Sequence, residues 1–259
     1  MEIDRYEPGV PSWIDIGSPN PQGAADFYGA LFGWDAPEGP PETGGYRVAM
    51  VGDRAVAGIG EQAHPGPPVW ATYVAVDNAD EAVAKVLAAG GQVVVPAMDV
   101  LDVGRMAIFT DPVGATFSVW EARTHPGAEL VNEPGTWSWS ELLTTDVEVS
   151  KDFYGAVFGW TASTQGAGPT GEYTEWQVNG RSVGGMMQKP PTMPAEVPPF
   201  WAVYFAVADT DAAVGRVAEL GGSVLMAPLD IEPGRFATVA DPFGGVFNVI
   251  ALTSELAGA

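Results

Sequence analysis

Hydrophobic and polar positions change along the chain from a period of two to a period near 3.6 and back. A strand is predicted over 11–17, and a helix follows over about 22–32. Ala24, Phe27, Tyr28 and Leu31 share one face of that helix, which ends at Gly33. Strands over 46–51 and 55–60 are joined by Gly52-Asp53-Arg54, which is a hairpin signal.

A second unit of similar plan follows. It is predicted to contain a strand over 69–76, a helix over about 79–88 closed by Gly90-Gly91, and strands over 93–96, 105–110 and 115–120. The turn Asp111-Pro112-Val113-Gly114 precedes the last strand. These two strand–helix–strands units predict the α+β class.

The whole pattern then repeats. The stretch from Trp13 to Trp34, which contains Phe-Tyr-Gly and Phe-Gly-Trp, returns as the stretch from Trp139 to Trp160. Later blocks, including Asp-Pro-x-Gly at 111–114 and 241–244, match in the same order, with the small drifts in spacing that loop insertions produce. The chain is therefore predicted to be a tandem duplication, with domains at 8–122 and 136–252 and a linker over 123–135 rich in Pro-Gly turns.

Phe-Tyr-Gly-x-x-Phe-Gly-Trp at the end of the first helix, with Asp-Pro-x-Gly before the last strand, resembles the vicinal oxygen chelate superfamily. That superfamily includes glyoxalase I, bleomycin-resistance proteins, fosfomycin-resistance transferases and extradiol dioxygenases. The resemblance covers about 8–122 and 134–252 and is strongest to tandem glyoxalase-like proteins of actinobacterial type. It implies paired βαβββ modules whose curled mixed sheets enclose a cleft.

The resemblance also implies four metal-ligand positions in each copy, usually His, Gln or Glu. In the first copy they hold Trp13, Ala71, Ser118 and one residue of 57–59; in the second they hold Trp139, Ala202, Asn248 and one residue of 184–186. Indole, methyl and glycine bind no ion, and a neutral Ser or Asn alone does not hold a divalent cation. We therefore expect neither a metal nor another cofactor.

Composition narrows the chemistry further. Cysteine is absent, and His64 and His125 are the only histidines; each precedes a proline, which indicates an exposed loop. The formal charge of −22, from 11 basic and 33 acidic residues, disfavours nucleic acid and anionic membranes as partners. With no long apolar run and no leader pattern at the N-terminus, a cytoplasmic protein is expected. A tandem fusion supplies its own domain pairing, so either a monomer or a homodimer is expected.

Two carboxylates are the candidate catalytic groups. If Ile14 and Ile16 lie under the helix, alternation directs Trp13 and Asp15 into the cleft. The same count directs Trp137, Trp139 and Glu141 into the second cleft. Partial burial would raise the pKa of either carboxyl toward the range useful for acid–base catalysis, and Glu141 is favoured because its side chain reaches further. The alternative is that each acid caps a backbone amide or pairs with an arginine such as Arg105 or Arg235.

A ligand-binding set rich in aromatic and Met side chains suits a flat or apolar molecule. Its predicted members are Trp13, Trp139, Trp137, Tyr46, Met50, Tyr173, Trp176, Trp70, Trp201, Ser118, Asn248, Arg105 and Arg235. Ordinary core packing is the competing interpretation of each aromatic residue.

Three functions remain open. The first is a metal-free lyase, isomerase or cyclase that transfers protons on a small organic or secondary-metabolite substrate. The second is a non-catalytic protein that sequesters a small molecule such as an antibiotic, as bleomycin-resistance proteins do. The third is a glyoxalase-like stress protein that acts on aldehydes.

Overall fold

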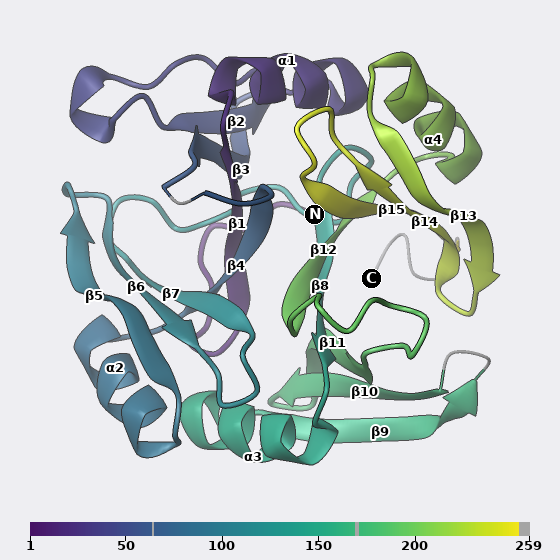
Figure 1. Cartoon of the computed structure of the whole chain (residues 1–259). Coiled ribbons are helices and arrows are strands. Elements are labelled where there is room, and N and C mark those ends of the chain that lie inside the picture. The colour runs from purple at the N-terminus through teal and green to yellow at the C-terminus, as the bar shows by residue number, and fades with distance from the viewer. Residues whose placement is uncertain (64, 169–170, 254–259) are drawn as a thin grey trace.

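Each sequence copy forms one mixed sheet. The computed structural model describes residues 1–63, 65–168 and 171–253, so His64 lies outside the described residues. The first sheet has seven strands in the order β2-β3-β1-β4-β7-β6-β5, and the second has eight in the order β13-β14-β15-β12-β8-β11-β10-β9 (Figure 1). The predicted α+β class with two tandem modules is confirmed.

The elements follow the predicted order in both copies. The first copy consists of β1 (Pro11–Ser18), α1 (Pro21–Phe32), a 3-10 turn (Pro41–Thr43), β2 (Arg47–Val51), β3 (Arg54–Glu61), β4 (Val69–Ala75), α2 (Ala79–Ala88), β5 (Gln92–Val100), β6 (Gly104–Thr110) and β7 (Thr116–Ala122). The second consists of β8 (Trp137–Thr144), α3 (Val147–Phe158), β9 (Thr161–Gly168), β10 (Gly171–Val178), β11 (Arg181–Gln188), β12 (Phe200–Ala206), α4 (Thr210–Glu219), β13 (Ser223–Ile231), β14 (Gly234–Ala240) and β15 (Val246–Leu252).

The copies differ at one strand. β9 pairs with β10 at the edge of the second sheet, whereas the corresponding first-copy segment, 35–45, forms only an isolated bridge and the 3-10 turn. That segment contains Pro37, Pro40 and Pro41. Proline has no N–H to donate to a sheet, which explains why the first copy lacks this strand.

Local signals fix the ends of the helices. The Asn20 side chain accepts a hydrogen bond from the Gly23 backbone N–H, and Pro21 occupies the first helical position of α1. Gly33 ends α1 with φ of 78°, in the left-handed region that glycine adopts without strain. Trp34 then turns back, and its indole N–H donates to the Gly135 carbonyl at 2.7 Å, which ties the first copy to the linker.

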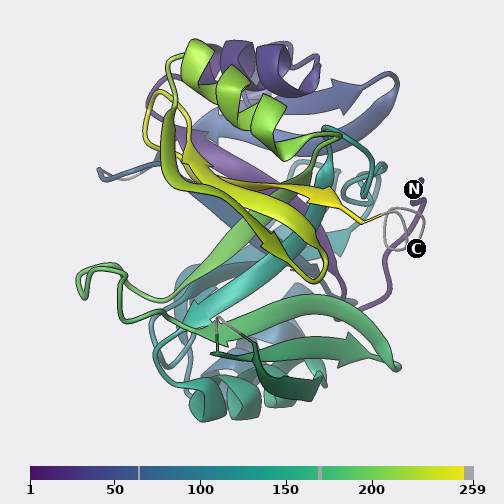
Figure 2. The same cartoon turned by 90° about the vertical axis from the view of Figure 1, so that its right-hand side faces the viewer.

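The apolar cores do not follow the sequence copies. One core joins α1 and β1–β3 of the first copy to β12, α4, β14 and β15 of the second. The other joins β4, α2, β6 and β7 of the first copy to α3, β10 and β11 of the second. Accordingly, α1 lies beside α4 and α2 beside α3, as Figures 1 and 2 show. Each half of one copy therefore packs on the opposite half of the other.

Two reciprocal hydrogen bonds cross between the copies. The Tyr28 hydroxyl of α1 donates to Asp241 Oδ2 at 2.9 Å, and the Tyr154 hydroxyl of α3 donates to Asp111 Oδ2 at 3.1 Å. The other oxygen of each aspartate accepts backbone N–H groups of its own Asp-Pro-x-Gly turn. The Phe-Tyr-Gly motif of each copy is thus hydrogen-bonded to the Asp-Pro-x-Gly turn of the other copy.

No helix in the described ranges is long and apolar enough to cross a membrane.

Because both cores contain both copies, we expect the chain to unfold as one unit. Phe205 is fully buried, and its ring lies 4.9 Å from that of Phe32 and 5.1 Å from that of Trp70, both in the other copy. Phe205→Ala should lower the free energy of unfolding by about 3–5 kcal/mol, in a single transition of the whole chain. Urea unfolding followed by circular dichroism and tryptophan fluorescence measures this, with Leu87→Ala on the exposed side of α2 as control. Two transitions, only one of them shifted by Phe205→Ala, would contradict the shared cores.

Candidate functional site

Cross-strand pairing identifies the side chains that share the sheet face opposite the helices, here called the inner face. Asp15 pairs with Gly58 and Ala71, Trp13 with Tyr73, and Tyr73 with Ser118. Directly paired residues project to the same side of a sheet. In the second copy the same relation links Glu141 with Gly185 and Ala202, and links Tyr204 with both Trp139 and Asn248. The four family ligand positions therefore do converge, once in each sheet.

A chain of hydrogen bonds surrounds Asp15. The Trp13 indole N–H donates to the Tyr46 hydroxyl at 3.0 Å, and that hydroxyl donates to Asp15 Oδ2 at 3.1 Å. The Tyr73 hydroxyl donates to the same oxygen at 2.9 Å. Among the described residues Asp15 Oδ1 has no hydrogen-bond partner, and the side chain keeps part of its surface exposed. Asp15 is half-buried with one oxygen available to a ligand.

The second sheet repeats this network with one substitution. The Trp139 indole N–H donates to the Tyr173 hydroxyl at 2.9 Å, and the Tyr204 hydroxyl donates to Glu141 Oε1 at 3.0 Å. Tyr173 also interacts with the Glu141 carboxyl. Glu141 is only 6% exposed, and is thus more deeply buried than Asp15. The two sheets share a Trp–Tyr–acid–Tyr network, and its acid is accessible in the first.

Burial dominates the ionisation of these groups. Loss of hydration raises the pKa of Asp15 to about 6, although the hydrogen bonds from Tyr73 and Tyr46 act in the opposite direction. Burial likewise raises the pKa of Glu141. Burial first, and then the nearby carboxylate, raise the pKa of Tyr46 and Tyr73 well above the usual value, so both phenols stay protonated and act as donors. The alternative was that each acid caps a backbone amide or pairs with an arginine. Among the described residues neither carboxyl does so, and their hydrogen-bond donors are tyrosine hydroxyls.

An apolar wall completes the inner face. Ser118 pairs with Ile108, and Met106 pairs with Met98 and Trp120, so these side chains lie on the same face as Asp15. Met98 is 46% exposed although it is apolar. The second sheet places Thr238, Phe236 and Leu229 at the matching positions. Exposed apolar side chains on the same sheet face as a half-buried acid are typical of a small-molecule binding surface.

Three of the predicted ligand-binding tryptophans lie instead in the cores. The Trp70 indole N–H donates to the Tyr28 hydroxyl at 3.2 Å, and that of Trp201 donates to the Tyr154 hydroxyl at 3.0 Å. Trp176 is fully buried and packs near Tyr154 and Trp160. Trp70 pairs with Ile16, so alternation places it under the helix, where the packing interpretation applies.

Two further predicted residues also lie away from the acids. A β-bulge between Trp137 and Trp139 pairs Trp137 with Phe205. The Trp137 side chain is therefore buried in the core and does not lie on the face of Glu141. The expected inward direction of Trp137 was therefore wrong, because the extra residue in the bulge breaks the alternation. Met50 packs against the core that contains α1.

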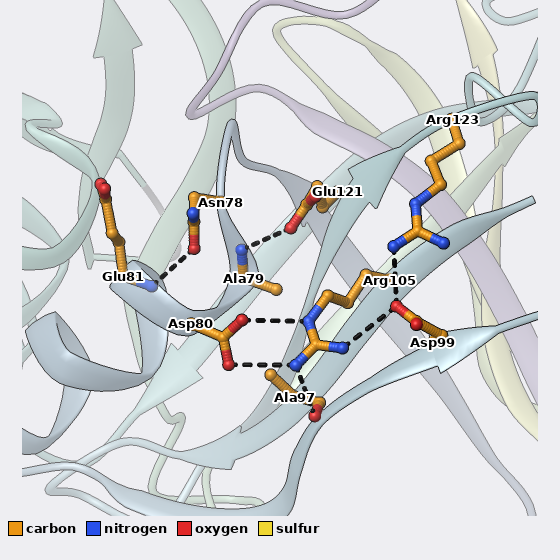
Figure 3. A network of polar contacts seen from close by, with 9 residues as sticks. All are labelled: Asn78, Ala79, Asp80, Glu81, Ala97, Asp99, Arg105, Glu121 and Arg123. Atoms are coloured by element: carbon orange, nitrogen blue, oxygen red, sulfur yellow. Dashed lines mark hydrogen bonds and ion pairs between the residues drawn. The ribbon is translucent and has the colours of Figure 1, made fainter.

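Arg105 and Arg235 hold the helix side of each sheet together. Figure 3 shows the Arg105 guanidinium between the Asp80 carboxylate of α2, at 3.0 Å, and Asp99 of β5, also at 3.0 Å. Asp99 also pairs with Arg123 at 2.7 Å, and hydrogen bonds from these arginines lower its pKa. Arg235 repeats the arrangement with Asp211 and Asp230. Both arginines are committed to these pairs on the helix side and do not face the acids.

Three residues of the inner faces escaped the sequence analysis as site residues. Tyr73 and Tyr204 occupy the same place in the repeated Trp-Ala-x-Tyr block, which was the available signal. His125 was expected to be exposed, but it is half-buried, and its ring lies 4.5 Å from that of Trp13. The linker packs across the start of β1, as the hydrogen bond from Ala128 N–H to the Ser12 carbonyl at 2.8 Å shows, and no local pattern reports such a contact.

Two surface hollows lie apart from the acids. One of about 420 Å³ lies beside α1 over Arg47, and one of about 340 Å³ lies beside the start of α3. They occupy matching places in the two copies, between the first helix and the strands after it, and neither is lined by Asp15 or Glu141.

The fold and the repeated motifs define the family. The chain belongs to the glyoxalase/bleomycin resistance protein/dioxygenase superfamily, whose family model matches residues 11–119 and 138–249. It is 43% identical over 254 residues to the putative glyoxylase CFP32 of Mycobacterium tuberculosis (strain CDC 1551 / Oshkosh), covering 95% of this chain and 96% of that protein. It is 39% identical over 266 residues to the anthracycline biosynthesis protein DnrV of Streptomyces peucetius, covering 96% of each.

Solved structures share the fold at low identity. The Mn(II)-bound glyoxalase from Novosphingobium aromaticivorans superimposes with a TM-score of 0.66 at 17% identity, over 94% of this chain and 82% of that one. The 2,3-dioxygenase LapB from Pseudomonas sp. KL28 gives 0.65 at 14% identity, over 95% and 93%. At such identities the likeness extends to the fold alone.

The residues at the family's metal positions do not fit a divalent ion. A side chain at Gly58 would collide with the Tyr46 hydroxyl, and one at Gly185 with the Tyr173 hydroxyl, so a protonated phenol fills the space of one ligand in each sheet. Together with the neighbouring Asp15 or Glu141, each set of converging positions then offers one carboxylate, neutral hydroxyls and, in the second sheet, an amide. Within the described ranges, no three His, Cys, Asp or Glu side chains gather closely enough to hold an ion.

The raised pKa of Asp15 has a consequence for stability. The pKa of Asp15 is about 6 in the folded chain and 3.8 for the free side chain, so the folded state binds the proton more tightly. The resulting contribution to the free energy of unfolding is fully present below pH 3.8 and is lost as the pH rises through 6. Asp15→Asn removes the buried charge. We therefore expect this variant to unfold with about 1–3 kcal/mol more free energy than the wild type at pH 8, and with little difference near pH 4.

Urea unfolding at pH 4, 5, 6, 7 and 8 measures this difference. Asp53→Asn is the matched control, because the Asp53 side chain is 96% exposed; its effect should stay within about 0.5 kcal/mol at every pH. A difference for Asp15→Asn that does not vary with pH would show that Asp15 does not titrate as described.

Proposed function

We propose that the chain is a metal-independent enzyme that binds a small, flat, largely apolar molecule on the inner face of the first sheet. Asp15 transfers a proton to and from it. The observation that carries the proposal is Asp15 itself, which is half-buried, has a pKa raised to about 6, and has one oxygen without a partner among the described residues. It shares its sheet face with the exposed apolar side chain of Met98. The curated relative named for anthracycline biosynthesis supports a polycyclic aromatic substrate class.

The proposed chemistry follows from the two oxygens of Asp15. Oδ2 stays bound to the Tyr46 and Tyr73 hydroxyls, which keeps the carboxylate oriented. Oδ1 accepts a proton from an acidic C–H or O–H group of the substrate, such as a carbon next to a carbonyl, and returns it at another atom. The outcome is an isomerisation, an elimination or a ring closure, and a pKa near 6 places the acid and base forms within reach of neutral pH.

The first sheet fits this role better than the second. The sequence favoured Glu141 for its longer side chain, but Glu141 is only 6% exposed. A second candidate function is the binding and sequestration of a ligand without turnover, and the exposed apolar side chains of Met98 and Leu229 on the inner faces favour it. A metal-dependent glyoxalase reaction is not supported, because the donors present do not fit the ion.

Proton exchange on an aromatic ketone tests the proposal directly. With β-tetralone in D₂O, the wild type should catalyse deuterium incorporation next to the carbonyl, followed by NMR, and a chelator should leave the rate unchanged. Asp15→Asn should reduce the rate by about 100-fold or more, the usual contribution of a positioned acid–base group, while the affinity for the ketone stays within a few-fold. Binding without exchange in the wild type would favour sequestration instead.

The pH dependence gives a second, independent prediction. Because the carboxylate is the base, the exchange rate should rise with pH through about 6 and then level off. Tyr46→Phe removes one of the hydrogen bonds that lower the pKa of Asp15, so its midpoint should move to higher pH. A midpoint that is the same in the Tyr46→Phe variant would exclude Asp15 as the titrating group.

A further inference from the structure

The linker contributes a histidine to the first inner face. The His125 ring stands edge-on to the Trp13 indole, with 4.5 Å between ring centroids and an interplanar angle of 89°. It also lies 5.9 Å from the Trp120 ring. Trp13 and Trp120 both belong to the inner face, because Trp13 pairs with Tyr73 and Trp120 pairs with Met106. The imidazole therefore packs against two tryptophans of the inner face that also carries Asp15.

The backbone on both sides holds this histidine in place. The His125 N–H donates to the Val103 carbonyl at 3.1 Å, and the His125 carbonyl accepts from the Trp120 indole N–H at 2.9 Å. Two residues later, Gly127 has φ of 118°, and a side chain there would collide with the Ser12 carbonyl. Only glycine lets the linker approach β1 this closely, so the position of His125 is built into the fold.

The ring nitrogens of His125 are left for a ligand. Burial lowers the pKa of the imidazole, and the negative charge of Glu129, the one charged group acting against this, does not reverse it. Glu129 is itself occupied, since its Oε2 accepts the Ala55 backbone N–H at 2.9 Å. At neutral pH the ring is therefore uncharged, with one N–H donor and one acceptor. No hydrogen bond within the described ranges uses either nitrogen.

The second copy has no counterpart. His64 and His125 are the only histidines of the chain, and neither follows the second sheet. Resting on the proposed function, we propose that His125 is a ligand-binding residue of the first inner face. Its neutral imidazole exchanges a hydrogen bond with a hydroxyl or carbonyl group of an aromatic ligand on this face, while Asp15 contacts the reacting end. The first site thereby selects polyoxygenated aromatic molecules over plain hydrocarbons.

The test compares two changes at this position with 1,8-dihydroxyanthraquinone as the probe. His125→Phe keeps a flat ring against Trp13 and removes both nitrogens, so the dissociation constant should rise about five- to tenfold, the worth of one neutral hydrogen bond. His125→Gln restores a donor and an acceptor and should stay within about twofold of the wild type, as should the surface control Leu87→Ala. Equal affinity of the wild type and His125→Phe would overturn the proposal.

A ring spectrum supplies a readout that packing alone would not change. The two histidines give two imidazole Cε1–H signals by NMR, and the one missing in His125→Phe identifies His125. Saturating probe should shift that signal and lower the pKa of the ring further, because the bond favours the neutral form. If the signal and its pKa stay unchanged while Asp15→Asn still loses exchange of β-tetralone, this inference fails and the proposed function stands. If Asp15→Asn keeps full exchange, the proposed function fails.

Discussion

The architecture depends on two buried hydrogen bonds that each copy gives to the other. Tyr28 donates to Asp241, and Tyr154 donates to Asp111. Each tyrosine hydroxyl is removed from water, so leaving it unpaired would cost the desolvation free energy of a polar group. The accepting aspartates also close the turns before β7 and β15, the strands that present Ser118 and Asn248 to the inner faces. The same hydrogen bonds that join the copies therefore set the positions of β7 and β15.

Much of this could be predicted because it is local. Period-two alternation in β1 correctly separated Ile14 and Ile16 from Trp13 and Asp15, and the turn and glycine signals set the ends of the helices. What failed was long-range. Trp70 and Trp201 were expected among the ligand-binding residues because alternation does not reveal which face of a strand is covered by a helix. Only the pairing of Trp70 with Ile16 shows this. The bulge before Trp139 and the linker contact of His125 with Trp13 likewise depend on partners distant in sequence.

The exchange of a ligand position for glycine explains the chemistry of the inner faces. At Gly58 the missing side chain makes room for the Tyr46 phenol, and at Gly185 for the Tyr173 phenol. A buried, protonated phenol donates a hydrogen bond and offers no negative charge to a cation. The two-tyrosine arrangement therefore suits the carboxylate that it surrounds. The fold keeps the geometry by which its relatives gather groups at one point, and fills that point with a single ionisable acid.

Comparison of the two copies separates the effects of packing from those of function. Because both cores contain both copies, core residues and turns are constrained in each, and these are the blocks that repeat in the sequence. The inner faces are constrained only in part, since Trp13 and Tyr73 also belong to a core, and other inner-face positions differ between the copies. Val48 stands where the second copy has Glu175, Met106 where it has Phe236, and Ser118 where it has Asn248.

Against this variation the Trp–Tyr–acid–Tyr network is retained in both sheets. Packing does not require a half-buried carboxyl surrounded by phenols, since such a group lowers stability above its pKa. Packing alone therefore does not account for its repetition, and its accessible form in the first sheet is the one on which the proposed reaction depends.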